Sequence, residues 1–589
     1  MNTRSTSIID IIGRREWDLG HGAVSERALH VTESLIQRLG LLKELDGHTG
    51  CVNCLEWNRD GSLLVSGSDD SQVILWEPYH QKLLQTIPTG HNGNIFSVKL
   101  LPASEDRVLA TCAADCQIKV LDVPFGEVTH QCSCHQGRVK RLAVSSHLPY
   151  LVWSAGEDGL VMQLDLRVKH QCRPAGGGGS VLVNLQATAG PASEAKCVAV
   201  SPARPDLLAV GANDPFVRVY DRRMSLAVTY VAYSADGSQL LANLGGEQVY
   251  LFDASHPRAE NVLDPAVLSR PAATEEPRPA TPALPARLDE LRQEANRCHQ
   301  QQHFSQAIQL NSRAIRLRDN VPNFYSNRAA AFMKRAWNGD IYAALRDCQR
   351  TLALQPGHMK AGFRLCWCLL ELGHLREAAQ AVTAFRRRHP QQAASHAVRI
   401  LERDLKEAQF HHAIDVGPTA EPLLKLESAL DSPALSEQER CWRRLSADYQ
   451  SRYCGHCNTT TDIKEANFFG RDGQFILAGS DDGTFFIWER QTAAIVRVLR
   501  GDATIVNCVQ PHPRLCLLAS SGIDSCVRLW GPLPEGAPQE RCVADAEHAA
   551  QANQQRMNAD PMDMMLLNFG SRVAGGDEAP GQGIPCRTS

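Results

Sequence analysis

The stretch LDGHTGCVNCLEWNRDGSLLVSGSDDSQVILWE, residues 45–77, decides the fold of this chain. It contains a Gly-His pair, an alternating strand, an Asp-Gly turn, a second strand, an Asp-Asp turn and a third strand that closes at Trp76. Strands of period two separated by such turns predict a small antiparallel sheet. His48, Ser66, Asp70 and Trp76 are spaced to form a hydrogen-bonded chain inside that sheet, because buried polar side chains need partners.

The same unit recurs along the chain, and its signature is that of WD-repeat β-propeller blades. Four weaker copies follow, and two more appear at 463–489 and 505–530. Five blades plus two make seven, a number that closes a ring without a long exposed sheet edge. We therefore predict blades one to five in residues 45–253 and blades six and seven in residues 453–531. The matching network residues of the last two blades are Asp482, Trp488, Asp524 and Trp530.

A second period interrupts the propeller pattern. Pro356 and Pro390 lie 34 residues apart, and a stretch of small residues, NRAAAF, occupies 327–332. This period and pattern predict tetratricopeptide repeats, which are helix pairs that stack into a solenoid. We expect three repeats and a capping helix over residues 288–408. The predicted fold class is thus multidomain β + α: a seven-bladed WD-repeat β-propeller with a three-repeat tetratricopeptide α-solenoid inserted between blades five and six.

Flanking segments complete the predicted domain plan. Residues 1–44 are expected to form an N-terminal helical arm, because apolar residues recur near helical spacing over residues 25–42. Such an arm would bury its apolar face against the propeller's own rim or in a groove of a partner. The other predicted segments are a Pro/Ala-rich linker (254–287), a second linker (409–452) and a C-terminal tail (532–589) with a short helix near 559–570.

Composition argues against several classes of function. The net charge of −4 and the pI of about 6.6 disfavour nucleic acid or an anionic membrane as the main partner, because both require a basic face. No apolar run is long enough to cross a bilayer, and the start of the chain lacks the apolar region of a secretory signal. The 20 cysteines therefore predict reduced thiols in a protein of the cytoplasm and nucleus. No phosphate-binding loop, nucleotide fingerprint or serine elbow occurs, so we expect no catalysis and no cofactor.

Two arginines stand out at the ends of blades three and four. Arg167 and Arg223 each follow a strand-ending aspartate, Asp165 or Asp221, by two residues, and the other five blades lack such an arginine. The chain leaves the sheet here at the rim of the ring. Two neighbouring guanidiniums there can each grip a partner's carboxylate or carbonyl with paired hydrogen bonds. The alternative is that each arginine is solvated or pairs with its own aspartate.

The solenoid contains a second candidate site. Tetratricopeptide domains that bind acidic chaperone C-termini have five polar residues on their inner helices, and this chain is similar at the matching positions. Three cations and two amides on one concave wall would hold a C-terminal carboxylate and an acidic side chain. The alternative is that the two asparagines only bridge neighbouring backbones. The five residues of this peptide-carboxylate clamp are Arg292, Asn296, Asn327, Lys360 and Arg364.

The string YCGHC, residues 453–457, matches the active-site string of protein disulfide isomerases. A redox motif needs a strand before it and a helix after it, so that the pKa of the first thiol falls, but the sequence that follows here is strand-like. Cys454, His456 and Cys457 would also make an incomplete ligand set for zinc. We therefore predict neither redox catalysis nor a metal site.

Four stretches carry a wider resemblance: GCVNCLEWN (50–58), GGEQVYLFD (245–253), YCGHCNTTTDIKEANFFG (453–470) and VQPHP (509–513). With the order of elements, they resemble the WD and tetratricopeptide repeats protein 1 (adipose) family. The chain departs from that family by lacking its long insertion after blade four. The resemblance implies a substrate receptor of cullin-4 RING ubiquitin ligases that docks on their DNA-damage-binding adaptor. It also implies restraint of fat storage, a nuclear and cytoplasmic location, and association with histones or a histone deacetylase.

These observations predict a non-catalytic substrate-recognition subunit. The adaptor would bind at the rim through Arg167 and Arg223, each beside its own aspartate, and through the N-terminal arm. Client proteins would bind the solenoid and the other propeller surfaces. The alternative function is a scaffold that binds heat-shock chaperone C-termini, or a histone- and deacetylase-associated corepressor, without a ligase role. We expect no direct nucleic-acid or membrane partner.

Overall fold

Strands and helices occupy separate parts of the chain. The computed structural model describes residues 31–168, 172, 180–214, 216–221, 230–245, 247–256, 258–259, 285–415, 447–461 and 463–558. Among these residues, those up to Arg258 and those from Tyr449 onward belong to a unit made mainly of strands. The described residues from Ala259 to Asp448 belong to a helical unit. The predicted fold class, a propeller with an inserted helical-repeat domain, is confirmed.

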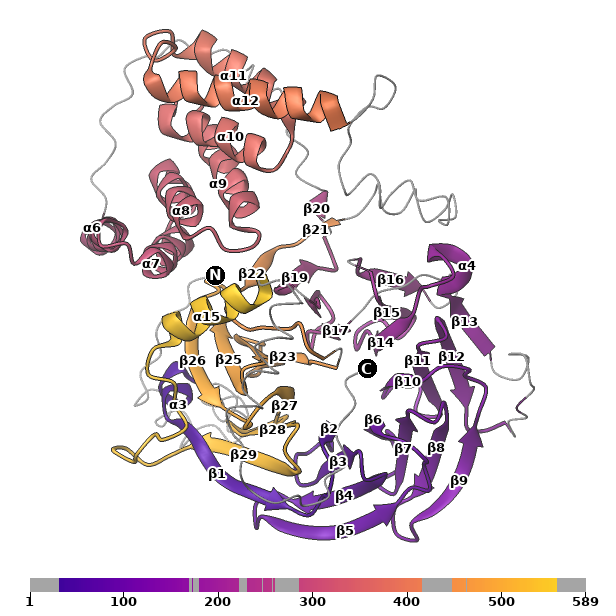
Figure 1. Ribbon diagram of the computed structural model, residues 1–589. Coiled ribbons are helices and arrows are strands. Elements are labelled where there is room, and N and C mark those ends of the chain that lie inside the picture. The colour runs from indigo at the N-terminus through magenta and orange to yellow at the C-terminus, as the bar shows by residue number, and fades with distance from the viewer. Residues whose placement is uncertain are drawn as a thin grey trace, which may run out of the picture. The chain divides into compact units, whose positions relative to one another are not determined.

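The described strands of the first unit form seven antiparallel sheets, which stand as blades around a common axis (Figure 1). The first three blades are β2 (Val52–Trp57), β3 (Leu64–Ser68), β4 (Gln72–Glu77), β5 (Lys82–Pro88); β6 (Ile95–Leu100), β7 (Val108–Ala113), β8 (Ile118–Asp122), β9 (Glu127–Cys132); and β10 (Val139–Val144), β11 (Leu151–Gly156), β12 (Leu160–Asp165), β13 (Ser180–Asn184). The fourth blade has three described strands, β14 (Ala195–Val200), β15 (Leu207–Ala212) and β16 (Arg218–Asp221). A short helix, α4 (Leu185–Ala189), precedes it.

The last three blades use strands from both ends of the unit. They are β17 (Tyr230–Tyr233), β18 (Gln239–Asn243), β19 (Val249–Asp253), β22 (Ser451–Tyr453); β23 (Ala466–Phe469), β24 (Phe475–Gly479), β25 (Thr484–Glu489), β26 (Ile495–Arg500); and β27 (Val506–Pro511), β28 (Leu518–Gly522), β29 (Cys526–Pro532), β1 (Leu39–Asp46). The core lies between neighbouring blades: Val73 and Ile87 of the first, for example, share a buried cluster with Ile95 and Leu109 of the second. Each blade therefore depends on its neighbours for burial of its faces.

The N-terminal segment closes the ring, which corrects part of the sequence prediction. Residues 1–44 were expected to form a helical arm, but in the described part only α3 (Glu33–Gln37) is helical, and β1 follows it. β1 pairs with β29 from Leu39↔Pro532 to Asp46↔Cys526. Leu39 and Leu45 are buried. The edge of β29 supplies hydrogen-bond partners to β1, and the strand conformation places alternate side chains of β1 on its buried face.

The helical insert interrupts a blade rather than a gap between blades. β22, which follows the insert, pairs with β19, which precedes it, at Val249↔Tyr453 and Leu251↔Ser451. The insert therefore lies between the third and fourth strands of the fifth blade. Two short strands, β20 (Arg258–Ala259) and β21 (Ala447–Asp448), pair with each other before and after it.

The helical unit consists of three helix pairs and a seventh, capping helix. The helices are α6 (Ala286–Gln300), α7 (Phe304–Leu317), α8 (Pro322–Arg335), α9 (Asp340–Leu354), α10 (Met359–Glu371), α11 (Leu375–Arg388) and α12 (His396–Asp415). Alanines such as Ala329, Ala344 and Ala361 are fully buried in its core, where their small side chains let neighbouring helices approach closely. Val398 and Leu401 of α12 cover the last pair. Among the described helices, none is long and apolar enough to span a membrane.

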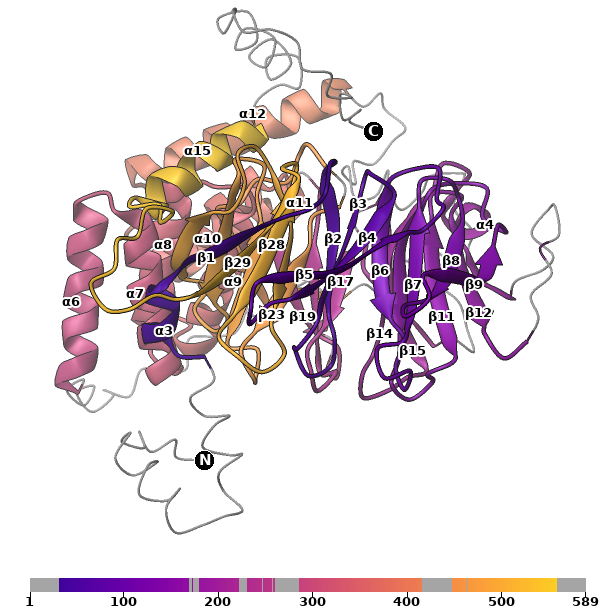
Figure 2. The same ribbon diagram turned by 90° about the horizontal axis from the view of Figure 1, so that it is seen from below.

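A helix that the sequence did not predict covers part of the propeller. α15 (Ala546–Asn558) lies against one face of the ring, as the side view shows (Figure 2). Asn553 is buried, and its Nδ2 donates to the carbonyl of Gly455 at 2.9 Å and to Asp482 at 3.0 Å. Gln248 Nε2 of the fifth blade donates to Gln554 Oε1 at 3.1 Å. The helix predicted near 559–570 lies outside the described residues.

Candidate functional site

The polar chain predicted for the first blade is present. His48 Nδ1 lies 2.9 Å from Asp70 Oδ2, and its Nε2 lies 2.8 Å from Ser66 Oγ. Trp76 Nε1 donates to the same Ser66 Oγ at 2.8 Å. Burial opposes ionisation of Asp70, but hydrogen bonds from His48 and the Thr49 N–H hold the pKa of its carboxyl below the ordinary value. These hydrogen bonds join the loop before β2 to β3 and β4, and they stiffen the blade that carries the rim loops.

Blade seven builds this network differently. Trp530 Nε1 donates to Ser520 Oγ at 2.8 Å, as expected. Asp524, however, accepts from Arg528 Nη2 at 2.7 Å, because Asp502 follows Gly501 where the first blade has His48. Burial raises the pKa of Asp502. Asp524 also accepts the backbone N–H of Ala503 at 3.1 Å, as Asp70 accepts that of Thr49, and its side-chain partner is an arginine instead of a histidine.

Blade six also departs from the prediction. Trp488 Nε1 donates to the carbonyl of Cys454 at 2.9 Å instead of to a serine. Asp481, one residue before Asp482, accepts the Thr459 N–H, which is the role that Asp70 has in the first blade. Asp482 instead accepts from α15. The expectation that Asp482 and Trp488 form a network like that of the first blade is therefore wrong.

The string YCGHC begins at the end of β22 in the fifth blade and continues toward the sixth. His456 is buried, and its Nε2 lies 3.1 Å from Asn243 Oδ1 of the fifth blade. Burial, with a smaller contribution from the Lys464 charge, lowers the pKa of His456 to about 4. Burial raises the pKa of the Cys457 thiol to about 11, so this thiol is protonated and a poor nucleophile near neutral pH. The string therefore connects two blades.

Arg167 lies at the rim and binds its own aspartate. Its Nε donates to Asp165 Oδ1 at 2.9 Å and its Nη2 donates to Asp165 Oδ2 at 2.7 Å, while the guanidinium carbon lies 5.6 Å from the centroid of the Tyr150 ring. The hydrogen bond from Arg167 is the main cause that lowers the pKa of Asp165. The alternative weighed from the sequence, pairing with the preceding aspartate, is thus the arrangement observed. Asp221 ends β16, and Arg223 lies outside the described residues.

Apolar side chains are exposed on the same edge of the ring as Arg167. The strands of a blade alternate in direction. In a four-stranded blade, the loop between the first and second strands and the loop between the third and fourth strands therefore lie at the same edge of the ring. Tyr150 and Val168 are 54% and 63% exposed in the third blade, Phe125 is 72% exposed in the second, and Tyr79 is 50% exposed in the first. We call these four residues and Arg167 the rim surface. Aromatic residues and arginine are the side chains enriched in protein interfaces.

The five predicted clamp residues lie on α6, α8 and α10, the first helices of the three pairs. Asn327 Nδ2 donates to Asn296 Oδ1 at 3.3 Å, so the two amides bridge α6 and α8. Arg292 pairs with Asp289 on its own helix. The two remaining clamp residues differ in exposure. Lys360 is exposed, whereas Arg364 is half-buried, and its Nη1 donates to the carbonyl and the hydroxyl of Ser326, at 2.8 Å each.

A cavity at the axis of the ring was missed from the sequence. It has a volume of about 350 Å³, and its lining includes Lys140, Arg141, Lys196 and Lys464. The pairing register of β10 shifts between Val139 and Arg141, and that of β14 shifts between Ala195 and Cys197, so Lys140 and Lys196 occupy β-bulges. A bulge re-aims the side chain of the extra residue. The recurrence of lysine at the second residue of an innermost strand was the available sequence signal.

Acidic side chains partly neutralise this cavity. Glu157 Oε1 lies 3.0 Å from Lys196 Nζ and 3.5 Å from Lys140 Nζ. Burial raises the pKa of Glu157, but these lysines and Arg138 outweigh it and lower the pKa overall. Asp214 and Glu247 also line the cavity. The arrangement suits an elongated polar ligand, such as a peptide segment, that exchanges ion pairs with the wall.

The comparisons with known sequences agree with this architecture. The model of the WD domain, G-beta repeat, matches residues 39–77, 81–122, 448–489 and 494–531. The WD and tetratricopeptide repeats protein 1 of Homo sapiens is 43% identical over 94% of this chain and 94% of its own length. The DDB1- and CUL4-associated factor 6 of Homo sapiens is 34% identical over 40% of this chain and 30% of its own length. A solved structure, the Myceliophteria_thermophila Cps50 (Swd1) beta-propeller domain, has a TM-score of 0.42 and 12% identity, and covers 84% of this chain and 100% of that one.

The likeness to the human protein extends over both units. It spans 94% of this chain, which is more than either unit contains alone. The WD repeats of such a propeller form a scaffold for protein–protein interactions. The chain belongs to the WD and tetratricopeptide repeats protein 1 family.

Proposed function

We propose that this protein is a substrate receptor of a cullin-4 RING ubiquitin ligase and that the rim surface docks on the ligase adaptor. Two observations support the proposal. A relative over 40% of this chain is named for association with DDB1 and CUL4. The edge of the ring that carries Arg167 also exposes Tyr79, Phe125, Tyr150 and Val168. The exposed apolar side chains beside a fixed guanidinium are the observation on which the proposal chiefly rests.

The rim surface has the features of a binding hot spot. Burial of three aromatic rings would supply most of the favourable free energy, and Arg167 would add directional hydrogen bonds to a carboxylate or carbonyl of the adaptor. Asp165 holds the guanidinium in place before binding, which reduces the side-chain entropy lost on docking. Arg223 and the N-terminal arm would extend the same contact.

Client proteins would occupy other surfaces of the molecule. The axial cavity, with its lysines, suits an acidic client segment, and the concave wall of the helical unit suits a second one. A receptor of this type accelerates ubiquitin transfer by raising the effective concentration of client lysines near the charged carrier enzyme. The receptor itself then needs no catalytic residue.

Co-precipitation from cells tests the proposal. The cullin-4 adaptor should be recovered with the wild-type chain and should be lost, or fall severalfold, with Phe125→Ser combined with Tyr150→Ser. Arg403 and Asp404 form a similarly exposed ion pair on α12, so Arg403→Ala is the matched control and should leave recovery unchanged. Equal adaptor recovery with the rim variant and with the wild type would contradict the proposal.

A second candidate function is the chaperone-binding scaffold. The observation in its favour is that Asn296, Asn327, Lys360 and Arg364 lie on successive first helices, with Lys360 exposed. Lys360→Ala with Arg364→Ala should then remove heat-shock chaperones from the precipitate and leave the adaptor. The internal hydrogen bonds of Asn327 and Arg364 already use part of this clamp, so we rank this function second.

Further properties implied by the family resemblance belong to the same proposal. These are a location in the cytoplasm and nucleus, association with histones or a histone deacetylase, and restraint of lipid storage. Mass spectrometry of the partners of the wild-type and rim variants would separate the partners that depend on the adaptor from those that do not.

A further inference from the structure

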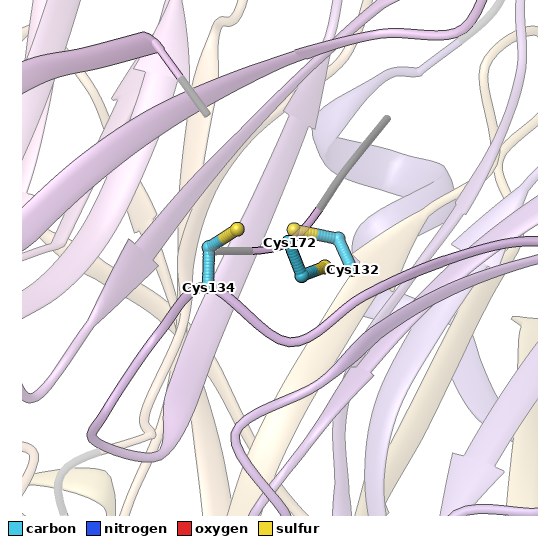
Figure 3. A group of neighbouring side chains, drawn as sticks. All are labelled: Cys132, Cys134 and Cys172. Carbon is cyan, nitrogen blue, oxygen red and sulfur yellow. The ribbon is translucent and has the colours of Figure 1, made fainter. Parts of the chain in front are cut away.

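Three cysteine side chains from separate parts of the chain meet at the propeller (Figure 3). Cys132 ends β9, the outermost strand of the second blade, and Cys134 lies two residues farther along. Cys172 comes from the connection between β12 and β13 in the third blade. The three Sγ atoms all lie within 4.8 Å of one another, and among the described residues they form the one such group of three potential metal ligands.

The surroundings of the three thiols differ from those of an ordinary buried cysteine. Cys132 and Cys134 are buried, while Cys172 is exposed, so the cluster has a closed side and an open side. The backbone N–H of Ser133 donates to Cys172 Sγ at 3.2 Å. An amide that donates to a sulfur stabilises the thiolate, and such outer hydrogen bonds are typical around thiolate ligands.

Burial and hydrogen bonds have opposite effects on the pKa values of these thiols. Burial raises the pKa of the Cys132 thiol to about 12. Burial also acts to raise the pKa of Cys172, but hydrogen bonds from Ser133, Cys134 and Cys132 outweigh it and lower that pKa below its ordinary value.

We propose that Cys132, Cys134 and Cys172 bind one zinc ion through their three thiolates, with the fourth position open to water or to an incoming ligand. Zinc accepts sulfur ligands at about 2.3 Å in tetrahedral geometry, which places the sulfurs roughly 3.8 Å apart, so the observed cluster needs only small side-chain adjustments. Thiolates select zinc over the hard cations magnesium and calcium. The exposed position of Cys172 provides the path of entry for the ion.

The ion would link two neighbouring blades. Cys132 ends the outer strand of the second blade, Cys134 follows that strand, and Cys172 belongs to the third blade. Zinc would therefore join two blades through residues that lie about 40 positions apart in the sequence. Binding requires the thiols to lose their protons, so the affinity should rise with pH. The proposal does not depend on the ligase function.

Metal content and cobalt spectroscopy of the full-length protein test this site. The protein is purified under reducing, oxygen-free conditions, and zinc is measured by mass spectrometry of the metals. Cys172→Ser and Cys132→Ser should each contain about one zinc ion less per chain than the wild type. Cys116→Ser, which removes a partly exposed thiol outside the cluster, should keep the wild-type content. Cobalt added to the metal-free wild type should produce the thiolate-to-cobalt charge-transfer absorption, and this band should be lost in the two cluster variants.

Three results would overturn the proposal. Wild type and Cys172→Ser could contain equal amounts of zinc, the wild type could bind copper in place of zinc under the same conditions, or peptide mapping could show a disulfide between two of the three cysteines in the reduced preparation. Thermal unfolding of each variant is measured in parallel. A cluster variant that unfolds is replaced by Cys172→Ala, because an exposed side chain tolerates this change.

Discussion

The guanidinium of Arg167 and the carboxylate of Asp165 form a two-point ion pair at the rim of the third blade, with Nε–Oδ1 at 2.9 Å and Nη2–Oδ2 at 2.7 Å. The side chain of Arg167 is 63% exposed. Exposed ion pairs contribute little to folding stability. The position of Arg167 is therefore better explained by a binding role than by a role in holding the blade together.

The buried hydroxyl of Ser66 should be essential to the first blade. Ser66→Ala leaves His48 Nε2 and Trp76 Nε1 buried without their partner, so it should lower the free energy of unfolding by roughly 1–3 kcal/mol. Ser62→Ala, at an exposed serine of the neighbouring turn, is the control and should change it by less than about 0.5 kcal/mol. Chemical denaturation followed by tryptophan fluorescence measures both. Equal effects of the two variants would show that the buried chain adds no stability.

The closing strand β1 should determine whether the ring is stable. Leu39 is fully buried beside Trp530, so Leu39→Ala should lower the free energy of unfolding by roughly 2–5 kcal/mol. Leu42 belongs to the same strand and is exposed, so Leu42→Ala should have a much smaller effect. If thermal unfolding shifts equally in both variants, the pairing of β1 with β29 does not close the ring.

Acid should weaken the contact between blades five and six. The pKa of His456 is about 4 in the folded protein, below the roughly 6.5 of an unfolded histidine. Its contribution is therefore complete above about pH 6.5 and is lost as the pH falls toward 4, by about 3 kcal/mol at most. His456→Gln should make stability less dependent on pH in this window, as measured by thermal unfolding at pH 7 and pH 4.5. Identical pH profiles for variant and wild type would contradict this assignment.

The amide of Asn553 should contribute most to the contact between the tail helix α15 and the ring. Asn553→Ala removes the hydrogen bonds to Gly455 and Asp482, so α15 should detach and be cut faster in limited proteolysis. Gln555→Ala, two residues away and exposed, should be cut at the wild-type rate. Wild-type resistance in the Asn553 variant would show that other contacts hold the helix.

Local patterns in the sequence were sufficient for the blades and helix pairs, but not for contacts between distant segments. The first blade was predictable because His48, Ser66 and Trp76 lie within one short unit. β1 was mistaken for a helix because its leucines fit either period, and its true partner β29 lies near the other end of the propeller sequence.

The sites that were not predicted from the sequence also depend on the three-dimensional arrangement of the chain, and not on local sequence patterns. Lys140 and Lys196 reach the axial cavity only because each occupies a bulge, which the alternation of side chains does not predict. Cys172 lies near Cys132 because the fold brings two neighbouring blades together, and not because the two residues are close in the sequence. The partners of Asp482 were not predictable because Asn553, which donates to it, belongs to α15, far along the chain.

Direct binding of the purified chain to the purified cullin-4 adaptor tests the docking role of the rim surface. We expect measurable affinity for the wild type, and a Kd at least tenfold higher for Arg167→Ala, which corresponds to about 1.4 kcal/mol. We expect an unchanged Kd for Arg403→Ala and unchanged thermal stability for both variants. An Arg167→Ala variant that binds the adaptor as tightly as the wild type, or a wild type that does not bind it, would show that the rim surface is not the docking site.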